Sequence, residues 1–218
     1  MNNKRRINLF VVQLLVSVMS KITGRRERKR QQTMDHLADT AWEMFEGEGY
    51  ETVTMEAIAE AADVAKGTLY KYFPVKEALL RHHFHRELSA GMPEVIAQLD
   101  KLPTAAEQLR GFLELGAEWS IRNRQHLGPY LHLRMSETSV PYDVNSPNRS
   151  GIDKVFARFI VQGQERGEFR CDLDIATATH YLEFLYLAAL MRWLNGMASD
   201  LHAEFHTMLD FGLRGLQA

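Results

Sequence analysis

Lysines, hydroxyls and phenols gather in one short segment, residues 65–73, with the sequence AKGTLYKYF. Its polar members are Lys66, Thr68, Tyr70, Lys71 and Tyr72, with Gly67 among them. Lysine pairs with phosphates, whereas hydroxyl and phenol groups form hydrogen bonds with phosphates and with base edges. The set contains no acidic residue, which would be common on a helix face that meets only water. We therefore expect this segment to contact nucleic acid.

Two short helices joined by a corner would position these side chains. Thr54 can accept a hydrogen bond at the start of the first helix, residues 63–65 are too few for anything but a turn, and Pro74 ends the second helix. A narrow apolar stripe would hold the two helices together: Ile58, Ala59, Ala62, Leu69 and Phe73. Two helices that meet at a steep angle over three or four residues form a helix-turn-helix unit.

Residues 37–80 resemble the DNA-binding domain of the TetR family of one-component transcriptional regulators. The matching positions are Leu37, Ala41, Phe45, Gly49, Tyr50, Thr54, Ile58, Ala59, Ala62, Val64, Lys66, Gly67, Thr68, Leu69, Tyr70, Tyr72, Phe73, Pro74, Lys76, Glu77 and Leu79. Asp63 and Ala65 stand where the family usually has glycine and serine. Aspartate tolerates a left-handed corner, but alanine removes a hydroxyl that could cap the second helix or contact phosphate. The operator sequence is therefore not carried over.

The resemblance implies an all-α fold in three parts: an N-terminal extension with a basic arm (1–30), the helix-turn-helix domain (31–80), and a helical domain for ligand binding and dimerisation (81–218). It also implies a repressor that binds a palindromic operator in double-stranded DNA as a homodimer. A small, largely apolar effector would release it. The DNA contacts that we assign are Thr54, Ala65, Lys66, Gly67, Thr68, Tyr70, Lys71, Tyr72 and Lys76, with Arg25, Arg26 and Arg28 of the arm.

Composition agrees with a globular protein that has a local nucleic-acid surface. The 218 residues are 45% hydrophobic and 25% charged, with a formal net charge of -2. The first 90 residues hold 14 Lys and Arg against 12 Asp and Glu, whereas the remainder holds 12 against 16. The single cysteine, Cys171, excludes an internal disulfide and fits a reducing cytoplasm. An exposed thiol or a redox switch are both open readings of it.

Residues 1–18 have three interpretations. Lys4, Arg5 and Arg6 precede an apolar run over residues 7–18, which resembles a secretory signal. The run is too short to span a membrane, which requires about 20 apolar residues. It could instead form an apolar helix that packs on the protein or rests on a membrane, which would make the chain a membrane-associated regulator or adaptor. It could also precede the true translation start at Met19, which we favour, so we expect no stable membrane insertion.

Residues 21–30 carry six basic residues and one acid just before the first expected helix. Such a run is either a solvated segment or an arm that contacts phosphates or the minor groove. The sequence leaves both possibilities open.

Helical periodicity continues to the C-terminus, and no stretch shows the sustained alternation of a strand. Helices are expected over residues 31–48, 76–91, 104–123, 126–136, 151–166, 174–195 and 200–216, with a loop over 137–150. The helix over 76–91 would join the DNA-binding domain to the rest. The helix over 174–195 is apolar almost all round, so it must be covered on several sides. By resemblance, the last two helices would pair with their copies in a second subunit.

Aromatic residues in the C-terminal domain could line an effector cavity, although most of them would serve as ordinary core. The candidates for its wall are Phe112, Trp119, Tyr130 and Phe156. Four polar side chains within apolar stretches could orient the effector: Arg122, Arg134, His180 and Glu183.

The sequence contains little evidence for metal binding or catalysis. The histidine pairs 82/83 and 82/85 have poor geometry for sharing an ion, and His202 and His206 lack further ligands. There is no GxSxG, HExxH or glycine-rich phosphate loop. We therefore expect no enzyme, no cofactor and no metal.

We predict different effects for two deletions at the N-terminus. Deleting residues 1–18 should leave DNA affinity and the midpoint of thermal unfolding unchanged, because this segment has no group suited to DNA. Deleting as far as Arg30 should lower the affinity, because the six basic residues of the segment 21–30 are lost as well. Fluorescence anisotropy with a labelled duplex and thermal unfolding measure the two effects. Aggregation or loss of binding after the shorter deletion would make the apolar run a structural element.

Overall fold

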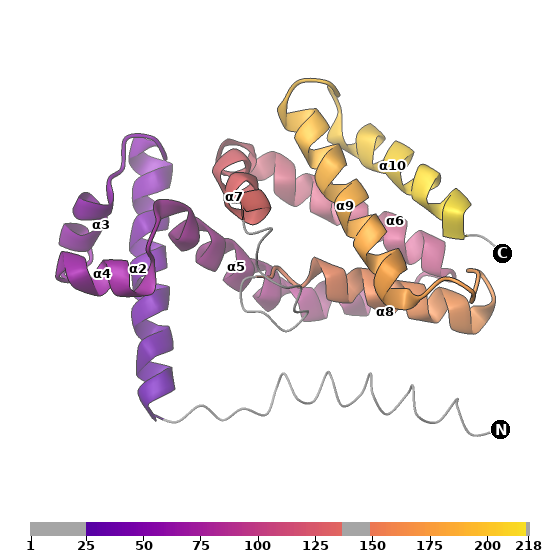
Figure 1. Ribbon diagram of the computed structural model, residues 1–218, viewed down its shortest axis with the longest axis horizontal. Coiled ribbons are helices and arrows are strands. Elements are labelled where there is room, and N and C mark those ends of the chain that lie inside the picture. The colour runs from indigo at the N-terminus through magenta and orange to yellow at the C-terminus, as the bar shows by residue number, and fades with distance from the viewer. Residues whose placement is uncertain (1–24, 137–148, 217–218) are drawn as a thin grey trace.

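A computed structural model describes residues 25–136 and 149–216, so the expectations for residues 1–24 and for the loop over 137–148 lie outside the described residues. Within the two described ranges the chain forms nine α-helices and no β-strand, which confirms the all-α expectation (Figure 1). The helices are α2 (Arg25–Glu48), α3 (Met55–Ala61), α4 (Lys66–Tyr72), α5 (Lys76–Leu99), α6 (Ala105–Arg122), α7 (Arg124–Ser136), α8 (Ile152–Arg166), α9 (Ile175–Leu194) and α10 (Leu201–Leu216).

Helices α2, α3, α4 and the start of α5 form a small head domain at one end of the molecule (Figure 1). The Thr54 hydroxyl accepts a hydrogen bond from the Ala57 amide at 3.2 Å, so it caps α3 as expected. Asp63 adopts a φ of 53° at the corner, the left-handed conformation that aspartate tolerates. Leu69 and Phe73 are buried, at 0% and 2% exposed, and hold α4 in the head core.

Two helices are longer than the sequence patterns predict. α2 begins at Arg25, about six residues before the expected start, so the second half of the basic segment is helical. α5 continues through Pro93 to Leu99, beyond the expected end near Gly91. Proline removes one N–H donor, and the acceptor that loses its bond is the carbonyl of Ser89. Because Ser89 is exposed, water can satisfy that carbonyl and the helix can continue.

Helices α6 to α10 form the body domain. α8 packs on α9, while α6 packs on α8 and α10. Thr104 and Glu107 form a reciprocal capping box at the start of α6. An aromatic chain runs through the core, with Tyr186 between the rings of Phe156 and Phe205 at centroid distances of 6.0 and 5.0 Å.

One face of the body remains apolar and uncovered. Tyr181, Phe184 and Phe211 on α9 and α10 are 66%, 58% and 71% exposed. A groove of about 700 Å³ runs between these two helices. The two helices pack against each other, with α10 at the upper edge of the body (Figure 1). Among the described helices, none is both long enough and apolar enough to cross a lipid bilayer.

A close helix-to-loop contact at the end of α8 makes a stability prediction. A Cβ added at Gly163 would lie 2.2 Å from the ring of Phe169, which is 2% exposed and cannot move aside. Gly163→Ala should therefore lower the free energy of unfolding by about 1–3 kcal/mol. Gly128→Ala in α7 is the matched control, because nothing lies within 4 Å of its added Cβ. It should be neutral or stabilising by up to about 1 kcal/mol. Equal urea midpoints for the two variants would contradict the packing.

Candidate DNA-contacting surface and effector site

α4 presents a polar face away from the head core. Lys66, Gly67, Tyr70 and Lys71 are exposed, and Thr68 and Tyr72 are half-buried. Leu69, on the opposite face, is fully buried. This division of faces is the one expected from the sequence. It leaves amines, hydroxyls and phenols available to a duplex.

An acidic residue that sequence reasoning missed lies next to this face. Glu56 of α3 accepts a hydrogen bond from the Tyr70 hydroxyl at 3.4 Å, and its carboxylate lies 3.7 Å from Lys66 Nζ. Both charged side chains are largely exposed, so the pair is weak. Glu56 therefore lowers the positive potential at one end of the face, and DNA must compete with it for Lys66.

α4 begins after Ala65, the position where the family usually has serine. No side-chain hydrogen bond caps α4, as expected from the missing hydroxyl. Arg28 is exposed on α2, and Arg25 and Arg26 belong to the first turn of the same helix.

Lys76 has a structural role that the sequence did not indicate. Its ammonium group donates to the backbone carbonyls of Tyr50 and Val53, at 2.5 and 2.9 Å, and lies 4.2 Å from the centre of the Tyr50 ring. These contacts hold the turn after α2 onto the start of α5. Two of the three ammonium N–H groups are thus used by the fold, and the contact of Lys76 with a phosphate stays a prediction.

A polar seam joins α2 to α5, and it accounts for two of the three neighbouring histidines. His82 Nε2 lies 2.7 Å from Asp35 Oδ1, and Arg86 is paired with Asp39. Burial acts to raise the pKa of Asp35, but hydrogen bonds from His82 and Gln31 outweigh it and hold the pKa below its usual value. His83 stacks on Trp42 at 4.3 Å, and burial lowers its pKa.

A second contact between head and body involves α7. His126 is 1% exposed, and its Nε2 lies 2.6 Å from Glu46 Oε1 near the end of α2. Trp42 packs edge-on against the same imidazole at 4.8 Å. The body therefore touches the head directly as well as through α5. The two partners are 80 positions apart in the sequence, so no local pattern predicted this contact.

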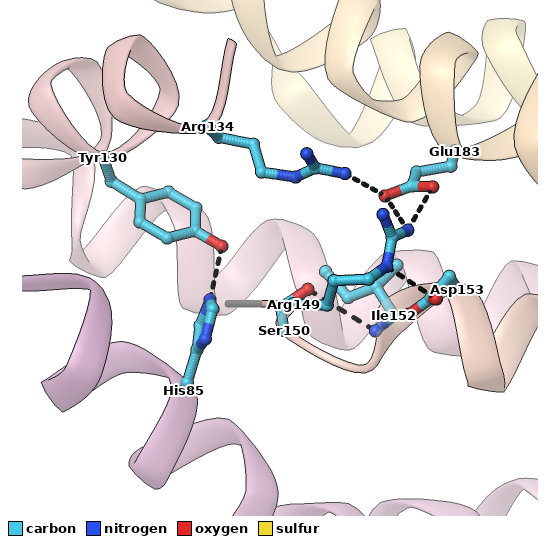
Figure 2. Close-up of polar contacts among 8 residues, drawn as sticks. All are labelled: His85, Tyr130, Arg134, Arg149, Ser150, Ile152, Asp153 and Glu183. Atoms are coloured by element: carbon cyan, nitrogen blue, oxygen red, sulfur yellow. Dashed lines mark hydrogen bonds and ion pairs between the residues drawn. The ribbon is translucent and has the colours of Figure 1, made fainter. Parts of the chain in front are cut away.

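A buried ion-pair cluster lies where α7, α8 and α9 meet (Figure 2). Arg134 of α7 donates to Glu183 of α9 at 2.9 Å, and Arg149 donates to both oxygens of the same carboxylate at 2.7 and 2.6 Å. Arg149 also donates to Asp153 at 2.9 Å. Glu183 and Asp153 are 8% and 2% exposed. Burial acts to lower the pKa of Arg149, but the two carboxylates outweigh it and raise the pKa.

Tyr130, one turn before Arg134 on α7, contacts α5. Its hydroxyl lies 3.0 Å from His85 Nε2, and it points from α7 toward the connecting helix (Figure 2). Burial raises the pKa of Tyr130 to about 12, so the phenol keeps its proton. A polar path therefore extends from the body to the helix that enters the head.

The structure brings together only some of the predicted effector residues. Arg134 and Glu183 are in contact, Tyr130 is near them, and His180 lies one turn before Glu183 on α9. Arg122 is exposed and borders a shallow depression beside Ile121 and Leu194. The remaining three aromatics pack in the core: Phe112 against Phe156, and Trp119 against Phe84. Sequence reasoning missed Arg149 and Asp153, because their roles depend on a contact with α9.

Comparisons with known proteins agree with this architecture. Residues 37–82 match the family model described as "Bacterial regulatory proteins, tetR family". The HTH-type transcriptional repressor KstR of Mycolicibacterium smegmatis is 44% identical over 196 residues, which cover 88% of this chain and 87% of that protein. The fatty acid metabolism regulator protein of Bacillus subtilis is 25% identical over 194 residues, 87% of this chain and 98% of that protein.

A solved structure extends the similarity to the body domain. FadR of Thermus thermophilus, a TetR-family transcriptional repressor in complex with lauroyl-CoA, superposes with a TM-score of 0.69 at 26% identity. The match covers 85% of this chain and 95% of that one. Similarity to regulators over nearly the full length agrees with the expectation that the chain is not an enzyme. It also confirms an all-α fold with an N-terminal helix-turn-helix part and a C-terminal helical part. The chain belongs to the TetR family of DNA-binding transcriptional regulators.

Proposed function

We propose that this protein is a cytoplasmic repressor that binds a palindromic operator as a homodimer and leaves it when an effector binds in the body. The polar face of α4 carries the proposal for DNA. Its exposed amines and phenols suit phosphates and base edges, and the buried Leu69 anchors the helix that presents them. The full-length similarity to a transcriptional repressor supports repression as the outcome.

The uncovered face of α9 and α10 supports the homodimer. Three exposed aromatic rings next to an apolar groove form a patch that a soluble monomer rarely leaves open. A second copy related by a two-fold axis would cover it with the same patch. Two α4 helices about 34–36 Å apart could then read two half-sites of a palindrome.

The effector that we propose has a long apolar part and one polar group, as a fatty acyl thioester has. The Thermus thermophilus relative was solved with lauroyl-CoA, and the Bacillus subtilis relative is named for fatty acid metabolism. In this chain, Arg134 and Glu183 form the polar end of the proposed site, beside the aromatic core of the body. A guanidinium at that place could donate to the carbonyl of the effector.

The path through Tyr130 supplies a mechanism for release. An effector that contacts the cluster also alters the environment of Tyr130, whose hydroxyl is bonded to His85 of α5. If the effector binds more tightly when α5 is tilted, its differential affinity shifts the dimer toward a spacing of heads that does not fit the operator. No direct contact between effector and DNA is required.

We predict opposite effects on DNA binding for substitutions of two neighbouring residues at the polar face of α4. Lys66→Ala should reduce the slope of log affinity against log salt by about 0.9, because one phosphate contact is lost. Glu56→Gln should raise the affinity roughly fivefold, because a carboxylate about 4 Å from that amine is neutralised. Both side chains are exposed, so neither change should unfold the head. Anisotropy titrations with a duplex from upstream of the gene measure both effects, and equal affinities in both variants would refute the assignment of this face.

The effector site makes a second prediction. Arg134→Gln should raise the lauroyl-CoA concentration required for half-release of DNA by about tenfold, because a charged donor worth roughly 1.5 kcal/mol is lost. DNA affinity without the effector should not change, because Arg149 still pairs with Glu183. Arg170→Gln is the matched control, since Arg170 pairs only at the surface with Asp172. Release at the wild-type concentration in both variants would place the effector elsewhere.

A further inference from the structure

The carboxylate of Glu46 connects the end of α2 to the start of α7. Its Oε1 atom lies 2.6 Å from His126 Nε2 and accepts a second hydrogen bond from the Gln125 side-chain amide at 3.1 Å. A carboxylate accepts hydrogen bonds and does not donate them, so Nε2 is the ring nitrogen that carries the proton. Among the described residues, none is a hydrogen-bond partner of the other ring nitrogen, Nδ1, which is buried. A buried nitrogen without a partner costs free energy, so stability alone does not account for a histidine at this position.

On the head side, this contact reaches the turn that sets the position of α3. Glu46 lies two residues before the last residue of α2. In the turn that follows α2, the carbonyls of Tyr50 and Val53 accept hydrogen bonds from Lys76. Thr54 caps α3 directly after this turn, and α3 packs on α4. A force on the end of α2 therefore reaches the helix-turn-helix unit by a route other than the long axis of α5.

On the body side, α7 is tied to α9 at two places. The Arg124 guanidinium lies 4.4 Å from the centre of the Trp193 ring, which is buried near the end of α9. Toward the other end of α7, Arg134 donates to the buried carboxylate of Glu183 (Figure 2). His126 lies between these two ties, about 12 Å along the helix from Arg134. An effector that changes the pairing of Arg134 would therefore displace His126 as well.

We propose that Glu46 and His126 form a latch through which an effector in the body displaces the end of α2, in addition to its action on α5. Trp42, one turn before Glu46 on α2, packs edge-on against the imidazole at 4.8 Å. The imidazole is thus held by two side chains of α2, so sideways movement of α7 passes to α2. Both latch residues act through the helices that carry them and are positioning residues. The inference rests on the proposed function, in which an effector at the ion-pair cluster lowers the affinity for DNA.

The latch also has a consequence that requires no effector. Coupling between two sites is reciprocal, because each ligand changes the affinity for the other by the same factor. A duplex bound at the head must therefore act back on α7 through the same contact. This response separates the latch from the identity of the effector.

The coupling is measured by the release factor, the ratio of duplex affinities without and with saturating lauroyl-CoA, with a duplex from upstream of the gene. Glu46→Ala should lower this factor about threefold to tenfold, because the acceptor of the latch is lost. Glu46→Gln should keep most of it, because the amide oxygen still accepts from His126. The Glu46 side chain is 49% exposed, so Glu46→Ala should change the duplex affinity without effector by no more than about twofold. Glu43→Ala is the matched control, because it removes an exposed carboxylate of the same helix and leaves the His126 contact in place.

The outcomes separate the latch from the proposed effector. Equal release factors in Glu46→Ala and Glu43→Ala would overturn the latch. If lauroyl-CoA does not release the wild type, the proposed effector is wrong, and hydrogen exchange without effector decides the latch. Exchange at the backbone amides of residues 124–136 should change when the duplex binds to the wild type or to Glu43→Ala, and should stay the same in Glu46→Ala. The same response in all three proteins, or no response in the wild type, would refute the latch itself.

Discussion

The structure depends on one helix that belongs to both domains. The first half of α5 buries Leu79 and Leu80, and its Phe84 packs between Trp42 of the head and Trp119 of the body. Its last residue, Leu99, is buried in the body. The paired charges of α2 and α5 fix the helix against the head, and the bond from His85 to Tyr130 fixes it against the body. Neither domain can shift without moving α5 or breaking one of these contacts, so the domains share one conformational equilibrium.

Local chemistry made the head predictable from the sequence. The cap at Thr54, the corner at Asp63 and the apolar stripe through Leu69 each follow from residues a few positions apart. Contacts between distant segments left no local pattern in the sequence. Lys76 binds carbonyls 23 and 26 residues away, and Arg149 meets a carboxylate 34 residues away. Periodicity describes which face of a helix is buried, but it does not say which helix covers that face.

The ion-pair cluster in the body costs hydration free energy and fixes the placement of three helices. Burying Glu183 and Asp153 removes their hydration, and the two arginines help to compensate for that loss. Truncating one partner of a buried pair typically costs about 3–5 kcal/mol, because the other charge is left unpaired. The cluster therefore fixes how α7, α8 and α9 are placed relative to one another. It also explains why a polar site persists beside an aromatic core, where apolar side chains would pack more simply.

The length of α5 turns small motions into large ones. At 1.5 Å per residue, its 24 residues make an arm about 36 Å long. A rotation of about 5° around the body end would carry the Lys76 end through about 3 Å, close to the rise of one base step at about 3.4 Å. Pro93 lies near the pivot, where the missing backbone bond makes bending easiest. A symmetric pair of such arms would change the span between the heads by up to about two base steps, which is enough to lose register with a rigid duplex.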